Sequence, residues 1–280
     1  MKQHTLLSSC SFAGVGLHSG KPVKMRLLPA PDDYGIVFQR TDLGEDAFVH
    51  AWIGNVSRTR RSTEIAENGI KVRTIEHLLA SLRCMGVDNV LIQLDAAEVP
   101  ILDGSALPYV RAIQECGQLE QRADRRCRVV KRHAEYRDRR SGSCIVVDPC
   151  DELVVELTID FKSPMIGVQK ARIDSSVDFA SQIAPCRTFC FCHEIALMRL
   201  LGLIKGGSLE NALVIDDRRM CYPGGKKLLF DNEPARHKLL DLLGDFALAG
   251  LPVQGRITAY RPGHKSNTEA LKYFISESVL

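Results

Sequence analysis

The sequence predicts a mixed α and β protein whose two halves follow a similar order of elements. Alternating apolar residues, typical of half-buried strands, occur in the second half, and both halves contain a segment with the apolar period of about 3.6 residues that indicates a helix. In each half a glycine ends the helix and a strand follows. The 280 residues suffice for one large domain or two modest ones, and the shared order hints at a duplication.

The composition is that of a folded globular protein. With 45% hydrophobic and 25% charged residues, the chain does not belong to the disordered, collagen-like or coiled-coil classes. No apolar run approaches the ~18 residues of a spanning helix, and no apolar signal segment stands at the N-terminus. The 10 cysteines include no CxxC pair, which argues against a structural zinc site. We therefore expect free thiols and a cytoplasmic location.

The net charge of +3 is too small to indicate nucleic-acid or membrane binding through the field of the whole molecule. Basic residues are concentrated between residues 121 and 140, where nine of them outnumber three acidic ones. This segment could bind an anion, but a solvated joint between domains is the commoner interpretation of such a run. Because Tyr136 is its only aromatic residue, it lacks the stacking platform of a single-strand binder, and we expect no nucleic-acid partner.

In the first half, short strands lead to one clear helix and a further strand. From Thr74 the apolar residues take i, i+3, i+4 and i+7 positions, and Gly86 ends this helix. The other expected elements are, in order, a hairpin punctuated by Gly14, Gly16 and Gly20, a turn at residues 29–33, a strand over Gly35 to Arg40, a buried strand over residues 90–94 and a second helix capped by Ser105.

The second half repeats this order after the basic segment. Residues 153–161 alternate between apolar and polar side chains, which predicts a strand. A helix begins near Glu233 and Pro234 and ends at Gly250, with proline at its start and glycine just past its end. The other expected elements are extended segments at residues 185–191 and 208–215, a strand over Gly255 to Tyr260 and a turn at Pro262-Gly263.

The polar face of the helix near residue 240 carries the first candidate site. With His237 placed at 0° on a helical wheel, Asp241 lies at about 40°, Asp245 at about 80° and Lys238 at about 100°, opposite the apolar side chains. A His and an Asp four residues apart point the same way, as two ligands of one metal ion must. An ordinary solvent-exposed His/Asp pair would give the same pattern.

The helix that starts near Thr74 supplies further candidates, since Glu76 and His77 lie in its first turn, away from its apolar face. The helix dipole disfavours an imidazolium there, so His77 is biased towards the neutral form that binds metals. Together with His237 and Asp241 it would make a site of two His and one Asp with an open position for water, the pattern of a catalytic zinc. Glu76 could take a proton from that water.

His264 follows a strand in a turn, where functional residues are common. By itself, it is better explained as a histidine of a surface loop.

Eight short motifs occur in order along the chain: Gly14-Val-Gly-Leu-His-Ser-Gly20, Thr74-Ile-Glu-His-Leu78, Gly86-Val-Asp-Asn-Val90, Pro100-Ile-Leu-Asp-Gly-Ser105, Arg187-Thr-Phe189, Gly206-Gly-Ser208, Arg236-His-Lys-Leu-Leu-Asp-Leu-Leu-Gly-Asp245 and Gly263-His264. With these motifs the chain resembles, nearly end to end, the zinc-dependent UDP-3-O-acyl-N-acetylglucosamine deacetylase family of lipid A biosynthesis.

The resemblance implies an α+β fold of two similar domains, each a sheet layered against helices, with the active site between them. The domains would span residues 1–122 and 141–280, joined by the basic segment 123–140. Each would contain an insert, at about residues 48–71 and 192–216, and the second insert would shape an apolar passage for an acyl chain.

The resemblance also implies roles for the site residues. Zinc, or iron(II) in the cell, would be held by His77, His237 and Asp241. Glu76 would be the general base, and the Thr188 hydroxyl would stabilise the oxyanion. His264, held by Asp245, would stabilise the intermediate as a cation and protonate the leaving amine. The substrate contacts would come from Lys238, Asp160, Phe161, Phe189, Phe191 and Arg261.

The implied reaction removes the N-acetyl group from UDP-3-O-(3-hydroxyacyl)-N-acetylglucosamine and releases acetate, carried out by a monomer with at most peripheral membrane contact. The alternative is a zinc-stabilised binding or scaffold protein without turnover, against which Glu76 and His264 speak, because neither is needed to hold a metal. Two departures from the family pattern stand out: Arg261 replaces a frequent lysine, and Arg60-Arg61-Ser62-Thr63 replaces a stretch in which many members carry a cysteine.

Overall fold

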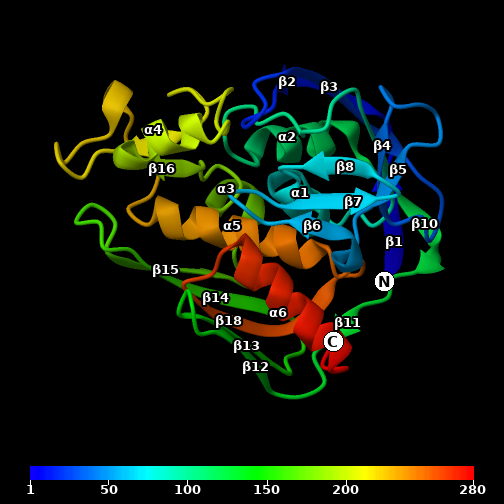
Figure 1. Cartoon of the computed structure of the whole chain (residues 1–280). Helices are drawn as coiled ribbons and strands as arrows, with labels where there is room; N and C mark the ends of the chain where they lie inside the picture. The colour runs from blue at the N-terminus through cyan, green and yellow to red at the C-terminus, as the bar shows by residue number, and fades with distance from the viewer.

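The computed structural model describes all 280 residues and confirms a mixed α and β fold, with six helices and several sheets (Figure 1). The first large sheet has the strand order β2-β3-β9-β4-β5. Its strands are β2 (Cys10–Val15), β3 (Pro22–Pro29), β9 (Val90–Leu94), β4 (Ile36–Arg40) and β5 (Phe48–His50).

The second large sheet has the order β12-β13-β18-β14-β15, and a short strand, β11, also pairs with β18. Its strands are β11 (Arg128–Val129), β12 (Ala134–Asp138), β13 (Ser143–Asp148), β18 (Val253–Tyr260), β14 (Leu153–Asp160) and β15 (Val168–Ile173). Part of the basic segment is therefore the edge of this sheet rather than a free joint. A separate pair of strands, β1 (Lys2–Leu6) and β10 (Gln118–Asp124), ends in the same segment.

The two large sheets share one pattern of strand directions. β9 is antiparallel to β3 and parallel to β4, and β18 is likewise antiparallel to β13 and parallel to β14. Each of these central strands is preceded by a helix, α1 (Glu76–Cys84) or α5 (Glu233–Ala247), and followed by another, α2 (Leu107–Cys116) or α6 (His264–Ser276). α1 has 9 residues and α5 has 15, and this difference in length obscures the repeat in the sequence.

Additional elements precede α1 and α5. Before α1, a three-stranded sheet consists of β6 (Val56–Arg58), β7 (Glu64–Glu67) and β8 (Ile70–Arg73), and a short 3-10 turn (Ile53–Asn55) comes before it. Because β5 pairs with β4 in the main sheet, this separate sheet starts at Val56 rather than near residue 48. Before α5 come α3 (Phe179–Gln182), β16 (Phe189–Phe191), α4 (Cys192–Leu200), β17 (Leu213–Ile215) and a second 3-10 turn (Pro223–Gly225). β16 and β17 are parallel partners.

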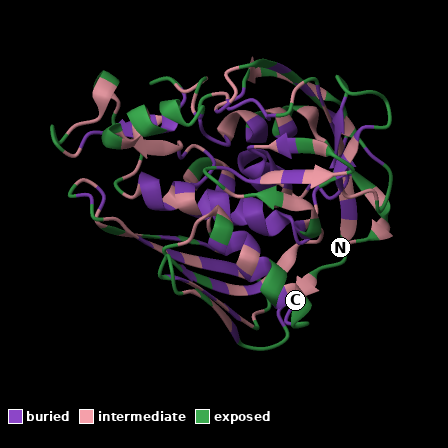
Figure 2. Ribbon diagram, viewed as in Figure 1, coloured by how far each residue is buried: buried purple, intermediate pink, exposed green.

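Helices α1 and α5 pack against each other and are buried along most of their length (Figure 2). Gly244 permits their close approach, because a Cβ atom at this position would lie 2.0 Å from the backbone oxygen of Glu76. Glycine inside a helix costs roughly 1 kcal/mol relative to alanine. Because Gly244 lacks a side chain, the first turn of α1 lies directly against the middle of α5.

Several elements differ from those that the sequence predicts. The extended segment at residues 185–191 is a strand only over Phe189–Phe191, and helices α3 and α4 were not predicted. α2 begins at Leu107 rather than at Ser105, whose hydroxyl accepts a hydrogen bond from the Leu107 N–H at 3.2 Å. The extended segment expected at 208–215 is a strand only from Leu213. The turn at Pro262-Gly263 leads into α6, a helix that was not predicted from the sequence. The spacing of Leu271 and Phe274, both fully buried, is nevertheless compatible with a helix.

Candidate metal centre and catalytic site

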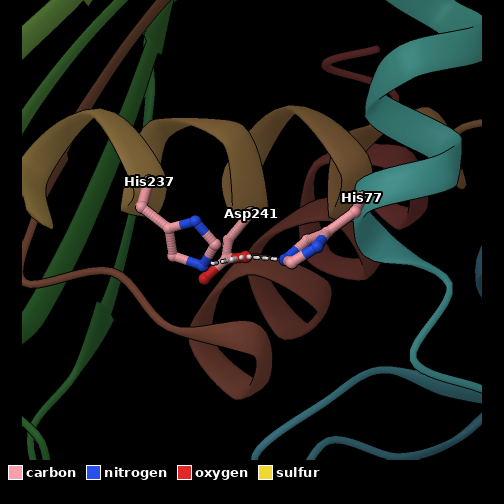
Figure 3. Close-up of side chains that lie close together, drawn as sticks. All are labelled: His77, His237 and Asp241. Atoms are coloured by element: carbon pink, nitrogen blue, oxygen red, sulfur yellow. Dashed lines mark ion pairs between the residues drawn. The ribbon is translucent and has the colours of Figure 1, made fainter. Parts of the chain in front are cut away.

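Three side chains from α1 and α5 converge on one point (Figure 3). His77 comes from the first turn of α1, and His237 and Asp241 come from successive turns of α5. Their ligand atoms all lie within 4.8 Å of one another. His237 and Asp241 are each only 2% exposed, which excludes the alternative of a solvent-exposed His/Asp pair.

The spacing of these atoms fits a bound ion. Asp241 Oδ1 lies 3.6 Å from Nε2 of His77 and 3.5 Å from Nε2 of His237. A tetrahedral zinc ion with ligand bonds of about 2.1 Å holds its ligand atoms roughly 3.4 Å apart. Nδ1 of His237 donates to the Cys186 carbonyl oxygen at 3.0 Å, which leaves Nε2 free to bind a metal.

The electrostatics keep His237 and Asp241 in the protonation states that metal binding requires. Burial lowers the pKa of His237 to about 3, so that its ring is neutral. Burial opposes ionisation of Asp241, but Lys238, His237 and His264 together hold the pKa of this carboxyl well below its usual range. Two imidazoles, of which that of His237 is held neutral, and a carboxylate are a donor set that suits a divalent metal of the zinc type.

Glu76, the first residue of α1, lies beside this cluster and is 4% exposed. Its Oε2 accepts a hydrogen bond from the Thr63 N–H at 3.1 Å, and its Oε1 lies 3.8 Å from His264 Nε2. Burial raises the pKa of the Glu76 carboxyl above its ordinary value. A buried carboxylate with a raised pKa is a stronger base than an exposed one, which is what proton abstraction from water needs.

His264 is the first residue of α6 and forms a pair with Asp245 of α5. Its Nδ1 donates to Asp245 Oδ2 at 2.9 Å. Burial by itself would lower the pKa of His264, but Asp245, Glu76 and Asp241 raise it to about 9. The ring is therefore a cation at neutral pH, although the N-terminus of a helix disfavours positive charge.

Two cavities meet at the site. One, of about 340 Å³, is mostly polar and is lined by residues that include Glu76, His77, Thr188, Phe189, His237, Lys238, Asp241, Arg261 and His264. The other, of about 170 Å³, is mostly apolar and is lined by residues that include Ile195, Met198, Ile204, Leu209 and Val214. Thr188 and Phe189 line both. A larger cavity of about 720 Å³ lies on the opposite side of α5 and contains none of these polar residues.

Most of the residues expected to contact substrate lie in or beside the polar cavity. Lys238 lines it, and its Nζ donates to Asp241 Oδ2 at 2.7 Å. Phe161 and Phe191 stand behind Phe189, with ring centroids 5.7 and 6.4 Å from it. Asp160 does not line the cavity. It accepts a hydrogen bond from the Tyr260 hydroxyl at 2.5 Å, where β14 and β18 end.

The structure adds three residues that sequence reasoning missed. Thr63 is fully buried, and its hydroxyl donates to Asp245 Oδ1 at 2.6 Å. Asn267 donates to Oδ2 of the same carboxylate at 2.8 Å. The third is Gly244. A glycine in the middle of an amphipathic helix could have indicated a close contact with another element. Thr63 was named only as part of the stretch that departs from the family pattern, and no signal marked Asn267. Both residues act through contacts distant along the chain.

The end of the basic segment also reaches the site. Asp138, the last residue of β12, and Ser141, just beyond the segment, line the polar cavity. The basic segment therefore contributes a residue, Asp138, to the lining of the polar cavity.

The α+β fold, the buried His/His/Asp cluster and the adjoining acid and base groups define the class of metal-dependent hydrolases. A family model described as UDP-3-O-acyl N-acetylglycosamine deacetylase matches residues 3–276. The chain belongs to this family.

Two relatives show how far the similarity extends. A UDP-3-O-acyl-N-acetylglucosamine deacetylase of Anaeromyxobacter sp. (strain Fw109-5) is 45% identical, over 98% of this chain and 89% of the relative. A bifunctional enzyme, LpxC/FabZ, of Bacteroides thetaiotaomicron is 40% identical over 96% of this chain and 63% of its own length. None of the helices in the structure has the length and apolar character needed to span a membrane.

Proposed function

We propose that the protein removes the N-acetyl group from UDP-3-O-(3-hydroxyacyl)-N-acetylglucosamine and releases acetate, a step of lipid A biosynthesis. The observation that carries the proposal is the convergence of a His/His/Asp cluster, a buried carboxylate and a His–Asp pair on one polar cavity that adjoins an apolar one. Membership of the deacetylase family supports the choice of substrate.

We propose zinc as the metal, held by His77, His237 and Asp241, with iron(II) as the alternative in the cell. When bound, such an ion acts as a Lewis acid on the amide carbonyl and lowers the pKa of water. The ligand spacing and the neutral imidazole of His237 support this assignment.

The protein's own groups would move the protons. Glu76 accepts a proton from the attacking water, which its buried position and raised pKa favour. The Thr188 hydroxyl, at the wall of the polar cavity, donates to the oxyanion that develops on the carbonyl oxygen. His264 is positively charged and donates its Nε2 proton to the leaving amine, while Asp245 holds Nδ1 and so keeps the ring oriented.

The substrate would span both cavities. The acyl chain occupies the apolar cavity, whose lining of Ile195 and Met198 suits hydrocarbon. Lys238 and Arg261, which line the polar cavity, offer positive charge to the diphosphate. The nucleoside then lies towards Asp160 and the three phenylalanines, whose rings pack edge-to-face or tilted against one another.

We also propose that the enzyme works as a cytoplasmic monomer of two related domains, divided within residues 123–140. The similar topology of the two large sheets supports the two domains. One chain supplies every residue of the metal cluster, which supports a monomer.

Acetate release tests the proposal. The wild-type protein and a Glu76→Ala variant are loaded with zinc, their metal content is measured, and acetate is assayed with the acylated UDP sugar as substrate. We expect equal metal in both proteins and an activity at least about a hundredfold lower in the variant, because general-base catalysis contributes on the order of 10²–10⁴-fold. Equal metal and no activity in either protein would instead support a zinc-stabilised binding or scaffold protein.

A further inference from the structure

An ion pair joins the additional elements that precede α1 to those that precede α5. Arg61 lies in the turn between β6 and β7, and Glu194 lies in the first turn of α4. The guanidinium contacts the carboxylate twice, with Nη2 to Oε1 at 2.6 Å and Nη1 to Oε2 at 3.2 Å. A two-point contact of this kind fixes the orientation of both side chains better than a single hydrogen bond does.

The pair lies where the two cavities meet. Arg61 lines the polar cavity and the apolar one, as do Leu17, Thr188 and Phe189, and it is the only charged residue that they share. Glu194 is carried on α4, the helix that contributes Ile195 and Met198 to the apolar cavity. The pair therefore ties one wall of the apolar cavity to the turn at its entrance.

The backbone conformation at Arg61 indicates that its side chain has a role beyond forming the turn. Arg61 has a φ of 64°, a region that non-glycine residues seldom occupy. A glycine would form this turn without strain, but it would lack the side chain that reaches Glu194. Because the Arg61 side chain is 45% exposed and that of Glu194 25%, solvent screens the pair and its contribution to global stability is small.

We infer that the Arg61–Glu194 ion pair is a clasp that shapes the entrance to the apolar cavity and thereby selects substrates by the length of their acyl chain. The inference rests on the proposed function, because it places an acyl chain in that cavity. The aliphatic stem of Arg61 covers the first carbons of the chain, as long cationic side chains commonly do on apolar surfaces. Glu194 holds the charged end away from the hydrocarbon. Both are specificity residues, and neither takes part in the chemical step.

The test compares substrates with a short (3-hydroxybutyryl) and a long (3-hydroxytetradecanoyl) acyl chain. For Glu194→Gln and for Arg61→Gln we expect KM for the long-chain substrate to rise roughly three- to tenfold, as loss of a partly exposed charge pair implies. KM for the short-chain substrate and kcat for both should stay within about twofold of wild type, because the chemical groups are untouched. The double variant Arg61→Glu/Glu194→Arg should recover the preference for the long chain.

Glu210→Gln is the matched control. It breaks another ion pair of the same region, with Lys226 at 3.4 Å, but neither partner lines the polar or the apolar cavity. We expect it to leave both KM values unchanged. If the clasp variants behave like this control, or change both substrates equally, the clasp is refuted while the deacetylase function stands. If wild-type protein hydrolyses neither substrate, the proposed function fails and the clasp fails with it.

Discussion

Helices α1 and α5 occupy the same place in the two halves of the molecule, yet they contribute to the site in different ways. α1 contributes Glu76 and His77 from its first turn only. α5 contributes His237, Asp241 and Asp245 from three successive turns. Because the end of one helix meets the middle of the other, neither half contains a complete site. Two helices in equivalent positions can thus build one asymmetric centre when the end of one packs against the middle of the other.

Removal of a ligand from α5 should have the largest effect. We expect Asp241→Asn to lose bound zinc and to reduce kcat/KM by on the order of 10³-fold or more, because the metal supplies several kcal/mol of charge stabilisation. Metal analysis after dialysis, together with acetate release, measures both. Full metal content in this variant would contradict the ligand assignment.

The contact between α1 and α5 can be disturbed by a substitution that leaves all three metal ligands unchanged. In Gly244→Ala the new methyl group must displace the backbone of Glu76, so we expect a loss of about 1–3 kcal/mol of unfolding free energy, as overpacking usually costs. We also expect weaker metal binding, because His77 moves away from Asp241. Denaturant unfolding and zinc titration measure the two effects. Gly263→Ala is the control for stability, since a Cβ atom at that position meets nothing within 4 Å.

The base Glu76, which precedes the first half's central strand, and the acid His264, from the second half, should give a bell-shaped pH profile of kcat/KM. The rate falls at low pH as Glu76 becomes protonated, and its raised pKa moves this limb upward. It falls at high pH as His264, with a pKa of about 9, loses its proton. Asp245→Asn removes the charge that raises the pKa of His264, so its alkaline limb should shift to lower pH. An alkaline limb that does not move in this variant would rule out His264 as the acid.

The smallest effect on activity is expected at Thr63, which links the turn before β7 to both helices. Thr63→Val keeps the shape of the side chain but removes the hydroxyl that donates to Asp245. We expect a loss of about 1–3 kcal/mol in stability, the usual cost of an unpaired buried acceptor, and a several-fold lower kcat. Thr268→Val serves as control, because the Thr268 hydroxyl is also buried but bonds only to backbone carbonyls of its own helix. Equal losses in the two variants would exclude a specific role for Thr63.

Local patterns in the sequence account for much of the fold. The apolar spacing after Thr74 and the proline and glycine around residues 233–250 predicted α1 and α5, since periodicity and capping act within a few residues. α6 was not predicted, because polar residues fill its first turns and its apolar spacing begins only at Ala270. The parallel pairing of β18 with β14 joins residues about a hundred positions apart, and no local pattern carries such information.

The sequence by itself determined which groups share a helical face, because 100° per residue places His237, Asp241 and Asp245 on one stripe whatever surrounds them. It could not decide whether that stripe faced water or another helix. The tertiary structure decided this through Gly244, whose missing side chain lets α1 approach and bring His77 to the Asp241 carboxylate. Burial then lowered the pKa of one histidine, while a cluster of carboxylates raised that of another. Such differences arise from neighbours that are distant in the chain, and they exist only once it has folded.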